Sequence, residues 1–228
     1  MNSYNEARQA LDPVVGVPFK ELAEVLEISL PKDPRKRKAV AGDIAEKLLE
    51  IAKNSIPKAD LQALGTEVKT VSLNTKSTPR EWTKITHFNI ETVSSQPDFR
   101  RSEVFKKLRC VLFVPIMKAD NNRPDFWHLR PPFLWLPTED QLEVLETDYV
   151  KIQGYAAERK WQGLSGRSGK FLSLKTSDAK TAGKSASEKG RAWWLTKDIT
   201  DEICEQNLWP KMAMGKRIRS LGPVSSTL

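Results

Sequence analysis

The sequence predicts an α/β fold in which helices flank a mixed sheet. Helical spacing of apolar residues dominates residues 5–55 and 138–158, whereas strand-like segments lie between them. Hydrophobic residues make up 39% of the 228 positions, with seven Trp and eight Phe. A chain of this size and composition can bury a core as one compact domain, or as two small lobes that share a cleft.

The N-terminal part reads as three helices. Residues 5–27 carry apolar side chains on both sides of a Gly16/Pro18 break, which predicts two short helices joined by a turn. A basic loop, "PKDPRKRKAVAGD", follows and holds four consecutive cations at 35–38. These cations could touch a phosphate backbone or belong to a solvated linker. The segment "GDIAEKLLEIAKNS" then has helical spacing.

The middle of the chain changes to strands. Three segments indicate strands, namely "EVKTVSL", "TKITHFNI" and "CVLFVPI". The last is a continuous apolar run, as expected of a strand buried on both faces. An aromatic, proline-broken segment, "FWHLRPPFLWLP", precedes a long amphipathic helix at 138–158.

The C-terminal part combines a basic loop with a strand and a helix. Between Arg167 and Arg191 there are seven basic residues and two acids among many Gly, Ser and Ala, which predicts a pair of loops. "RAWWLTKDITDEICEQNLW" then indicates a strand that runs into a helix.

Composition narrows the function classes. The formal net charge of +8 favours a polyanionic partner, although many basic proteins simply carry solvated lysines. Two Cys and two His provide neither a disulfide framework nor a zinc site. The N-terminus has no apolar signal segment, and no apolar run approaches the ~18 residues of a membrane span. We therefore expect a cytoplasmic protein that does not act in a membrane.

One short stretch carries the chemistry. In "DLQALGTEVKTVSL", Glu67 and Lys69 lie two residues apart on a strand and project to the same side. Gly65 can turn the chain so that Asp60 brings a second carboxylate to the start of that strand. Two such oxygen ligands suit Mg²⁺, which keeps several waters and accepts phosphate oxygens, and Lys69 could orient the attacking water or stabilise developing charge. Alternatively, the three residues are a surface salt bridge and an unrelated helix cap.

The same residues resemble a known family. "ADLQALGTEVKT" is similar to the catalytic segment of the MutH-type endonucleases, which include a mismatch-repair nicking enzyme and GATC restriction enzymes of the PD-(D/E)xK superfamily. The similarity continues in order through "GDIAEKLLE", "VFKKLRCVLFVPI", "PPFLWLPTEDQ", "KTSDAK" and "RAWWLTK". This resemblance implies a restriction-endonuclease-like fold in two sub-lobes around a DNA-binding cleft.

The resemblance also assigns roles and boundaries. It places further active-site groups on Glu46 and Lys107, although periodicity alone would make Glu46 a solvated helix residue. It implies a single domain over 1–228, with a catalytic core at about 40–160 and a DNA-reading loop and last strand at about 163–197. The expected DNA-binding residues are Lys175, Asp178, Lys180, Lys184, Trp194, Arg101 and Lys106.

The reading loop departs from the family pattern. Ser173 and Leu174 stand where the family has an arginine and a proline, Asp178 replaces an asparagine, and Trp194 replaces a tyrosine. Because arginine reads guanine bidentately and lysine less restrictively, these exchanges put GATC in doubt as the target.

Together these features predict a sequence-specific, Mg²⁺-dependent endonuclease acting on double-stranded DNA. The departures favour a type II restriction enzyme. A mismatch-repair nickase with a MutL-type activator is the alternative, and a non-catalytic DNA-binding module is the alternative from another class. One metal site per chain means that cutting both strands would need a transient homodimer or two successive nicks.

Overall fold

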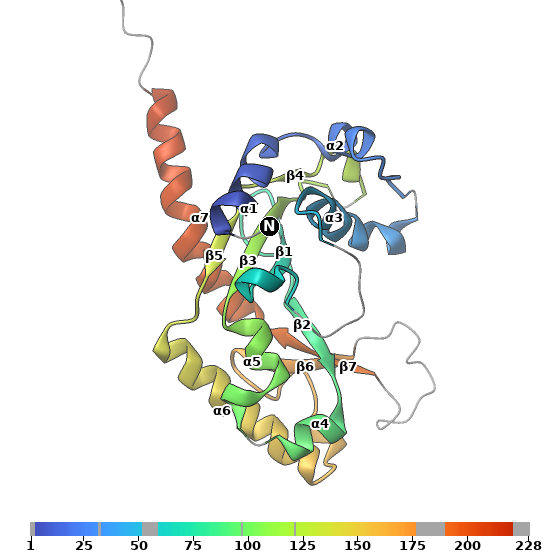
Figure 1. Cartoon of the computed structure of the whole chain (residues 1–228), viewed down its shortest axis with the longest axis vertical. Coiled ribbons are helices and arrows are strands. Elements are labelled where there is room, and N and C mark those ends of the chain that lie inside the picture. Colours follow the sequence, from blue (N-terminus) through green and yellow to red (C-terminus); the bar gives the residue numbers. More distant parts are fainter. Residues whose placement is uncertain are drawn as a thin grey trace, which may run out of the picture.

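The computed structural model describes the chain except for residues 1–2, 32, 52–58, 97, 121, 177–189 and 221–228. It confirms a mixed α/β fold (Figure 1). The helices are α1 (Tyr4–Leu11), α2 (Phe19–Val25), α3 (Pro34–Leu48), α4 (Ile90–Ser95), α5 (Glu103–Leu108), α6 (Glu139–Ala157) and α7 (Lys197–Ser220). The strands are β1 (Glu67–Leu73), β2 (Thr83–Phe88), β3 (Val111–Met117), β4 (His128–Leu129), β5 (Phe133–Trp135), β6 (Leu172–Thr176) and β7 (Arg191–Leu195).

The described strands form two sheets. In the first, β1 runs parallel to β3, and β4 and β5 pair antiparallel with β3. The second is antiparallel, in the order β2-β7-β6. The sequence predicted one mixed sheet, and only the first sheet is mixed. β2 leaves β1 after the turn at 74–78 and pairs with β7 instead, with an irregular register between Lys84 and Thr86.

β3 is the centre of the fold, and all seven of its residues are buried. Its side chains alternate between two hydrophobic clusters, because successive residues of a strand point to opposite faces. Leu112 and Val114 pack with α1, α2 and α3, whereas Val111 and Phe113 pack with α4 to α7 and the second sheet. The molecule therefore has two lobes, with α2 and α3 at one end and α4 to α6 at the other (Figure 1).

Two N-terminal expectations have different outcomes. The two short helices before residue 27 are confirmed as α1 and α2. The basic loop is wrong, since residues 35–38 belong to the first turns of α3. Pro34 explains the difference: proline is favoured at the first position of a helix, and here it begins one instead of extending a loop.

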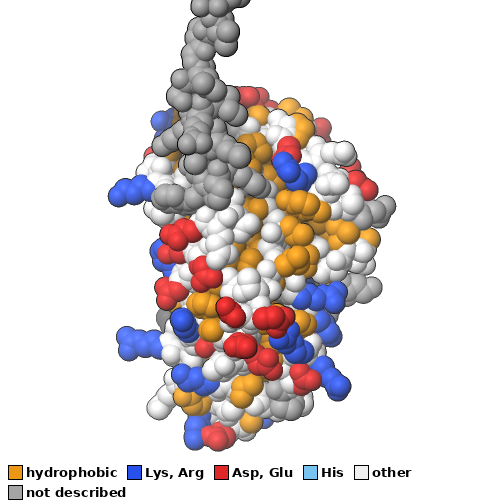
Figure 2. Space-filling view, turned by 90° about the vertical axis from the view of Figure 1, so that its left-hand side faces the viewer, with side chains coloured by type: hydrophobic (Ala, Val, Ile, Leu, Met, Phe, Trp, Pro, Cys, Tyr) orange, Lys and Arg blue, Asp and Glu red, His pale blue; other side chains and the backbone are white. Residues whose placement is uncertain are grey.

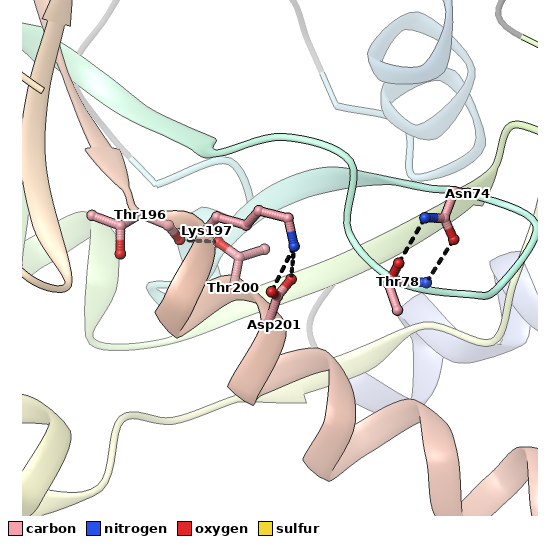
Figure 3. A network of polar contacts seen from close by, with 6 residues as sticks. All are labelled: Asn74, Thr78, Thr196, Lys197, Thr200 and Asp201. Carbon is pink, nitrogen blue, oxygen red and sulfur yellow. Dashed lines mark hydrogen bonds and ion pairs between the residues drawn. The ribbon is translucent and has the colours of Figure 1, made fainter.

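Local hydrogen bonds fix the chain where β1 and β7 end (Figure 3). After β1, the Asn74 amide donates to Thr78 Oγ1 at 2.7 Å, while Thr78 N donates back to Asn74 Oδ1 at 3.1 Å. After β7, the Thr200 hydroxyl donates to the Thr196 carbonyl at 2.8 Å, and Lys197 pairs with Asp201. These contacts set the starts of the β1–β2 connection and of α7.

Candidate active site

A tight turn returns the chain to the start of β1. Leu61 and Thr66 form an isolated bridge, and Gly65 closes the turn with a φ of +59°, a left-handed conformation that costs a non-glycine residue energy. The turn brings Asp60 beside β1, where its Oδ2 accepts a hydrogen bond of 2.9 Å from Val68 N. The sequence predicted this return of Asp60.

Asp60 can reach a backbone donor of β1 because β1 is an edge strand of the first sheet. Glu67 N donates inward to the Cys110 carbonyl, just before β3. The next N–H, of Val68, points the other way and is taken by Asp60. A carboxylate is thus held at the edge of the sheet by a backbone donor.

Glu67 lies between two lysines. Its side chain is 4% exposed. Lys69 Nζ donates to Oε1 at 2.6 Å, and Lys107 Nζ donates to Oε2 at 2.7 Å. Each oxygen of this buried carboxylate therefore meets an ammonium group, as a buried charge requires.

Lys107 reaches Glu67 because of a short capped helix. The Ser102 hydroxyl accepts from Phe105 N at 3.1 Å, and this N-cap begins α5. Lys107 lies in the last turn of α5, immediately before β3, which pairs with β1. The chain thus delivers Lys107 to the start of β1 from a segment 40 residues away.

A cleft of about 380 Å³ opens beside the edge of β1. Asp60 and Lys69 line it on one side, and Glu46 of α3 joins them. The opposite side comes from the second sheet. The remaining lining residues are Gly42, Ala45, Val68, Thr70, Val71, Ser72, Glu81, Trp82, Thr83, Lys84, Lys118 and Trp194.

Glu46 shows where periodicity misleads. It lies outside the apolar stripe of α3, which predicts a solvated residue, yet its side chain is half-buried in the cleft lining. The helix packs one face on the core while its flank borders the cleft. Only the family resemblance indicated this position.

Sequence reasoning did not single out Trp82 or Lys118, both of which line the cleft. Lys118 is 6% exposed and its Nζ lies 4.2 Å from the centroid of the Trp127 ring. A lysine that directly follows a fully buried strand was the available signal. Trp82 precedes β2 and had no signal beyond its type.

Lys175 and Trp194 are brought together by the β6–β7 pairing. Ser173 lies opposite Trp194, two residues before Lys175. The Lys175 Nζ is 3.9 Å from the centroid of the Trp82 ring and 5.5 Å from that of Trp194. Burial lowers the pKa of Lys175 below its usual value, against the opposing effect of Glu81.

The other expected DNA-binding residues are spread differently. Asp178, Lys180 and Lys184 lie outside the described residues. Arg101 and Lys106 are exposed on the 3₁₀ helix Phe99–Arg101 and on α5, and they pair with Asp98 and Glu103. Exposed pairs of this kind contribute little to stability and can open toward a phosphate.

The donor set fits Mg²⁺ under one condition. Asp60 and Glu46 line one cleft, and carboxylate oxygens are hard ligands. No group of three or more His, Cys, Asp or Glu in the described part of the chain is arranged to hold a metal ion. Mg²⁺ needs only one or two protein carboxylates, but Glu67 does not line the cleft, so it can serve as one only if the metal reaches the lone pairs that its two lysines leave.

Known proteins match this chain across the site. The family model of the DNA mismatch repair enzyme MutH matches residues 49–148. The DNA mismatch repair protein MutH of Haemophilus influenzae strain PittGG is 27% identical over 199 residues, covering 83% of this chain and 89% of that protein. MutH of Shewanella baltica strain OS155 is 28% identical over 179 residues, covering 78% and 80%.

The chain is similar to the MutH-type DNA endonucleases over most of its length. The matched range contains Asp60, Glu67, Lys69 and Lys107, whereas Glu46 and the strands β6 and β7 lie outside it. The reading loop favoured a restriction enzyme in the sequence analysis. The matched relatives are mismatch-repair proteins, so the comparisons support the repair alternative better. No helix in the described ranges is long and apolar enough to cross a membrane.

Proposed function

We propose that this protein is a Mg²⁺-dependent DNA endonuclease of the mismatch-repair type, which hydrolyses a phosphodiester bond in one strand of double-stranded DNA. One observation carries the proposal: Asp60, Lys69 and Glu46 line a single cleft at the edge of β1, and Lys69 holds the buried Glu67 there. Carboxylates that hold a metal beside a lysine are what phosphodiester hydrolysis needs.

Asp60 and Glu67 are the proposed metal ligands, with Glu46 adjoining them. A bound Mg²⁺ would polarise the scissile phosphate and lower the pKa of a water molecule. Asp60 is already oriented by Val68 N, which leaves its other oxygen for the cleft. Glu67 would hold the metal through a lone pair that Lys69 and Lys107 leave unused.

The two lysines then have different roles. Lys69 lines the cleft, so its ammonium group can orient the attacking water or stabilise the charge that develops on the phosphate. Lys107 keeps the second Glu67 oxygen neutralised and holds that side chain in place. Lys107 is thus a positioning residue, and Lys69 is the catalytic one.

DNA is proposed to bind over the cleft, where the two lobes meet. The lining offers Lys69, Lys84 and Lys118, and Lys175 lies next to it. By contrast, the lower half of the face in Figure 2 carries a group of acidic side chains with Lys and Arg among them, so its charge is mixed and suits a phosphate backbone less well. Arg101 and Lys106 would extend the contact along the backbone.

The repair assignment implies a partner and a product. A MutL-type activator would stimulate cleavage, and a chain with one site would leave nicked circles. A restriction enzyme, the second candidate, would produce linear DNA without an activator, through a transient homodimer or two successive nicks. The departures at Ser173, Leu174 and Trp194 favour the restriction enzyme only in that they alter the DNA sequence that we expect the protein to recognise.

Supercoiled plasmid separates these functions. We expect the purified chain to convert it to nicked circles with Mg²⁺ and not with EDTA, and a MutL-type activator to raise the rate. Linear product without the activator would identify a restriction enzyme. DNA binding without any cleavage, under all these conditions, would leave a non-catalytic DNA-binding module and overturn the proposal.

A further inference from the structure

A second hollow of about 570 Å³ adjoins the cleft. Three tryptophans from separate segments line it: Trp82 before β2, Trp161 of the 3₁₀ helix Trp161–Gly163, and Trp194 of β7. We call it the tryptophan pocket. Trp82 and Trp194 line the cleft as well, so the two spaces border the same two rings.

Cations sit on the rings of this pocket. Lys175 lies over Trp82, and the Arg191 guanidinium lies 5.3 Å from the centroid of the Trp161 ring. Burial lowers the pKa of both groups, so both are partly withdrawn from water. A cationic ligand would be repelled by them, whereas a ligand that carries a phosphate would be attracted.

One of the lining tryptophans also has a buried polar atom without a partner in the described part of the chain. Trp194 Nε1 is a buried side-chain nitrogen with no hydrogen-bond partner among the described residues. Buried tryptophan N–H groups usually find an acceptor.

We propose that the tryptophan pocket takes one nucleobase turned out of the DNA that lies over the cleft. A base is planar and can stack on an indole ring, where it would take a face now covered by Lys175 or Arg191, and its own phosphate would attract these two cations. The inference rests on the proposed function only in that the ligand is DNA. It adds a binding site beside the one that cuts.

The test measures binding without cleavage. The full chain, in EDTA, is titrated against a short duplex with one extrahelical 2-aminopurine and against the same duplex with an abasic residue at that position. We expect the duplex with the base to bind about tenfold more tightly, as for one base stacked on an aromatic ring. Equal affinities for the two duplexes would overturn the inference.

Variants locate the effect. Trp161 lines the tryptophan pocket and not the cleft, so Trp161→Leu should bring the affinity ratio close to one, while Trp161→Phe keeps an aromatic face and most of the ratio. Phe126→Leu removes an exposed aromatic ring elsewhere and is the matched control. If Trp161→Leu, folded by circular dichroism, keeps the full ratio, the base binds elsewhere and the pocket assignment fails.

The two proposals fail separately. A chain that prefers the extrahelical base but never cuts plasmid in Mg²⁺ has the tryptophan pocket and lacks the proposed activity. A chain that nicks plasmid and binds both duplexes equally has the activity and lacks the base-binding site.

Discussion

Two buried carboxylates in this molecule are satisfied in different ways. Glu67 of β1 is buried and is held by the ammonium groups of Lys69 and Lys107. Asp148 of α6 is 6% exposed and accepts from three consecutive backbone N–H groups, those of residues 170, 171 and 172. Both avoid the penalty of an unpaired buried charge.

The difference lies in what can be exchanged. A lysine side chain can swing away and give its place to another cation, whereas a backbone N–H stays with the strand that carries it. Gly169 lets the backbone wrap around Asp148, since a Cβ there would lie 2.6 Å from its carboxyl carbon. Asp148 therefore anchors the start of β6, whereas Glu67 has exchangeable partners, which the proposed role as a metal ligand requires.

The largest expected effect is on cleavage. Glu67→Gln removes a proposed ligand charge and should slow plasmid nicking by about a thousandfold or more. DNA affinity should hold or rise, because Lys69 and Lys107 lose their carboxylate partner. A nicking rate within a few-fold of the wild-type rate, measured with Mg²⁺ on folded protein, would show that Glu67 is not a catalytic residue.

Asp148→Ala should have the largest effect on stability. Three N–H groups would lose a charged acceptor, so the free energy of unfolding should fall by about 3 kcal/mol in urea titrations. Glu143→Ala, which removes an exposed carboxylate from the same helix, is the control and should change little. Equal behaviour of the two variants would show that Asp148 does not anchor β6.

Lys107→Met tests the ion pair between Lys107 and Glu67, and we expect a smaller loss of stability than for Asp148→Ala. One oxygen of the buried Glu67 would lose its cation, and only Lys69 would remain paired with this carboxylate. The free energy of unfolding should therefore fall by about 2 kcal/mol. In the double variant with Glu67→Gln, most of that cost should disappear, which a double-mutant cycle measures. Additive losses would mean that the two residues are not coupled.

Lys175→Met should have the smallest effect, on DNA affinity. Losing one phosphate contact reduces the slope of log affinity against log salt by about one, and weakens binding by roughly 1 kcal/mol. Lys151→Met removes the same charge from the exposed side of α6 and should leave the slope unchanged. Identical slopes for both variants would exclude a phosphate contact at Lys175.

Much of the fold was accessible from local patterns. The apolar run at 110–116 predicted a strand buried on both faces, and β3 is one. The helix predicted at 138–158 begins with a capping box between Thr138 and Gln141, which a sequence can display. The basic run at 35–38 was misleading, because it predicted a loop and Pro34 begins a helix there.

The candidate site was accessible only in part. Glu67 and Lys69 share a strand face, so their contact follows from the alternation of side chains. Lys107 reaches the same carboxylate from a distant segment, and Glu46 enters the cleft from the flank of α3. Contacts between distant segments depend on how helices and sheets pack, which no local pattern contains. The division into two sheets, and with it the meeting of Trp82 and Trp194, is of this kind.

The central claim is that Asp60 and Glu67 hold a catalytic Mg²⁺ at the edge of β1. It is tested most directly by the rate of plasmid nicking as a function of Mg²⁺ concentration, for wild type and for Asp60→Asn. Asn keeps an oxygen that can accept from Val68 N, so the turn should hold while the charge is lost. We predict a saturable rise for wild type and almost no nicking for Asp60→Asn at any Mg²⁺ concentration, with DNA affinity retained. Superimposable curves for the two proteins would contradict the account.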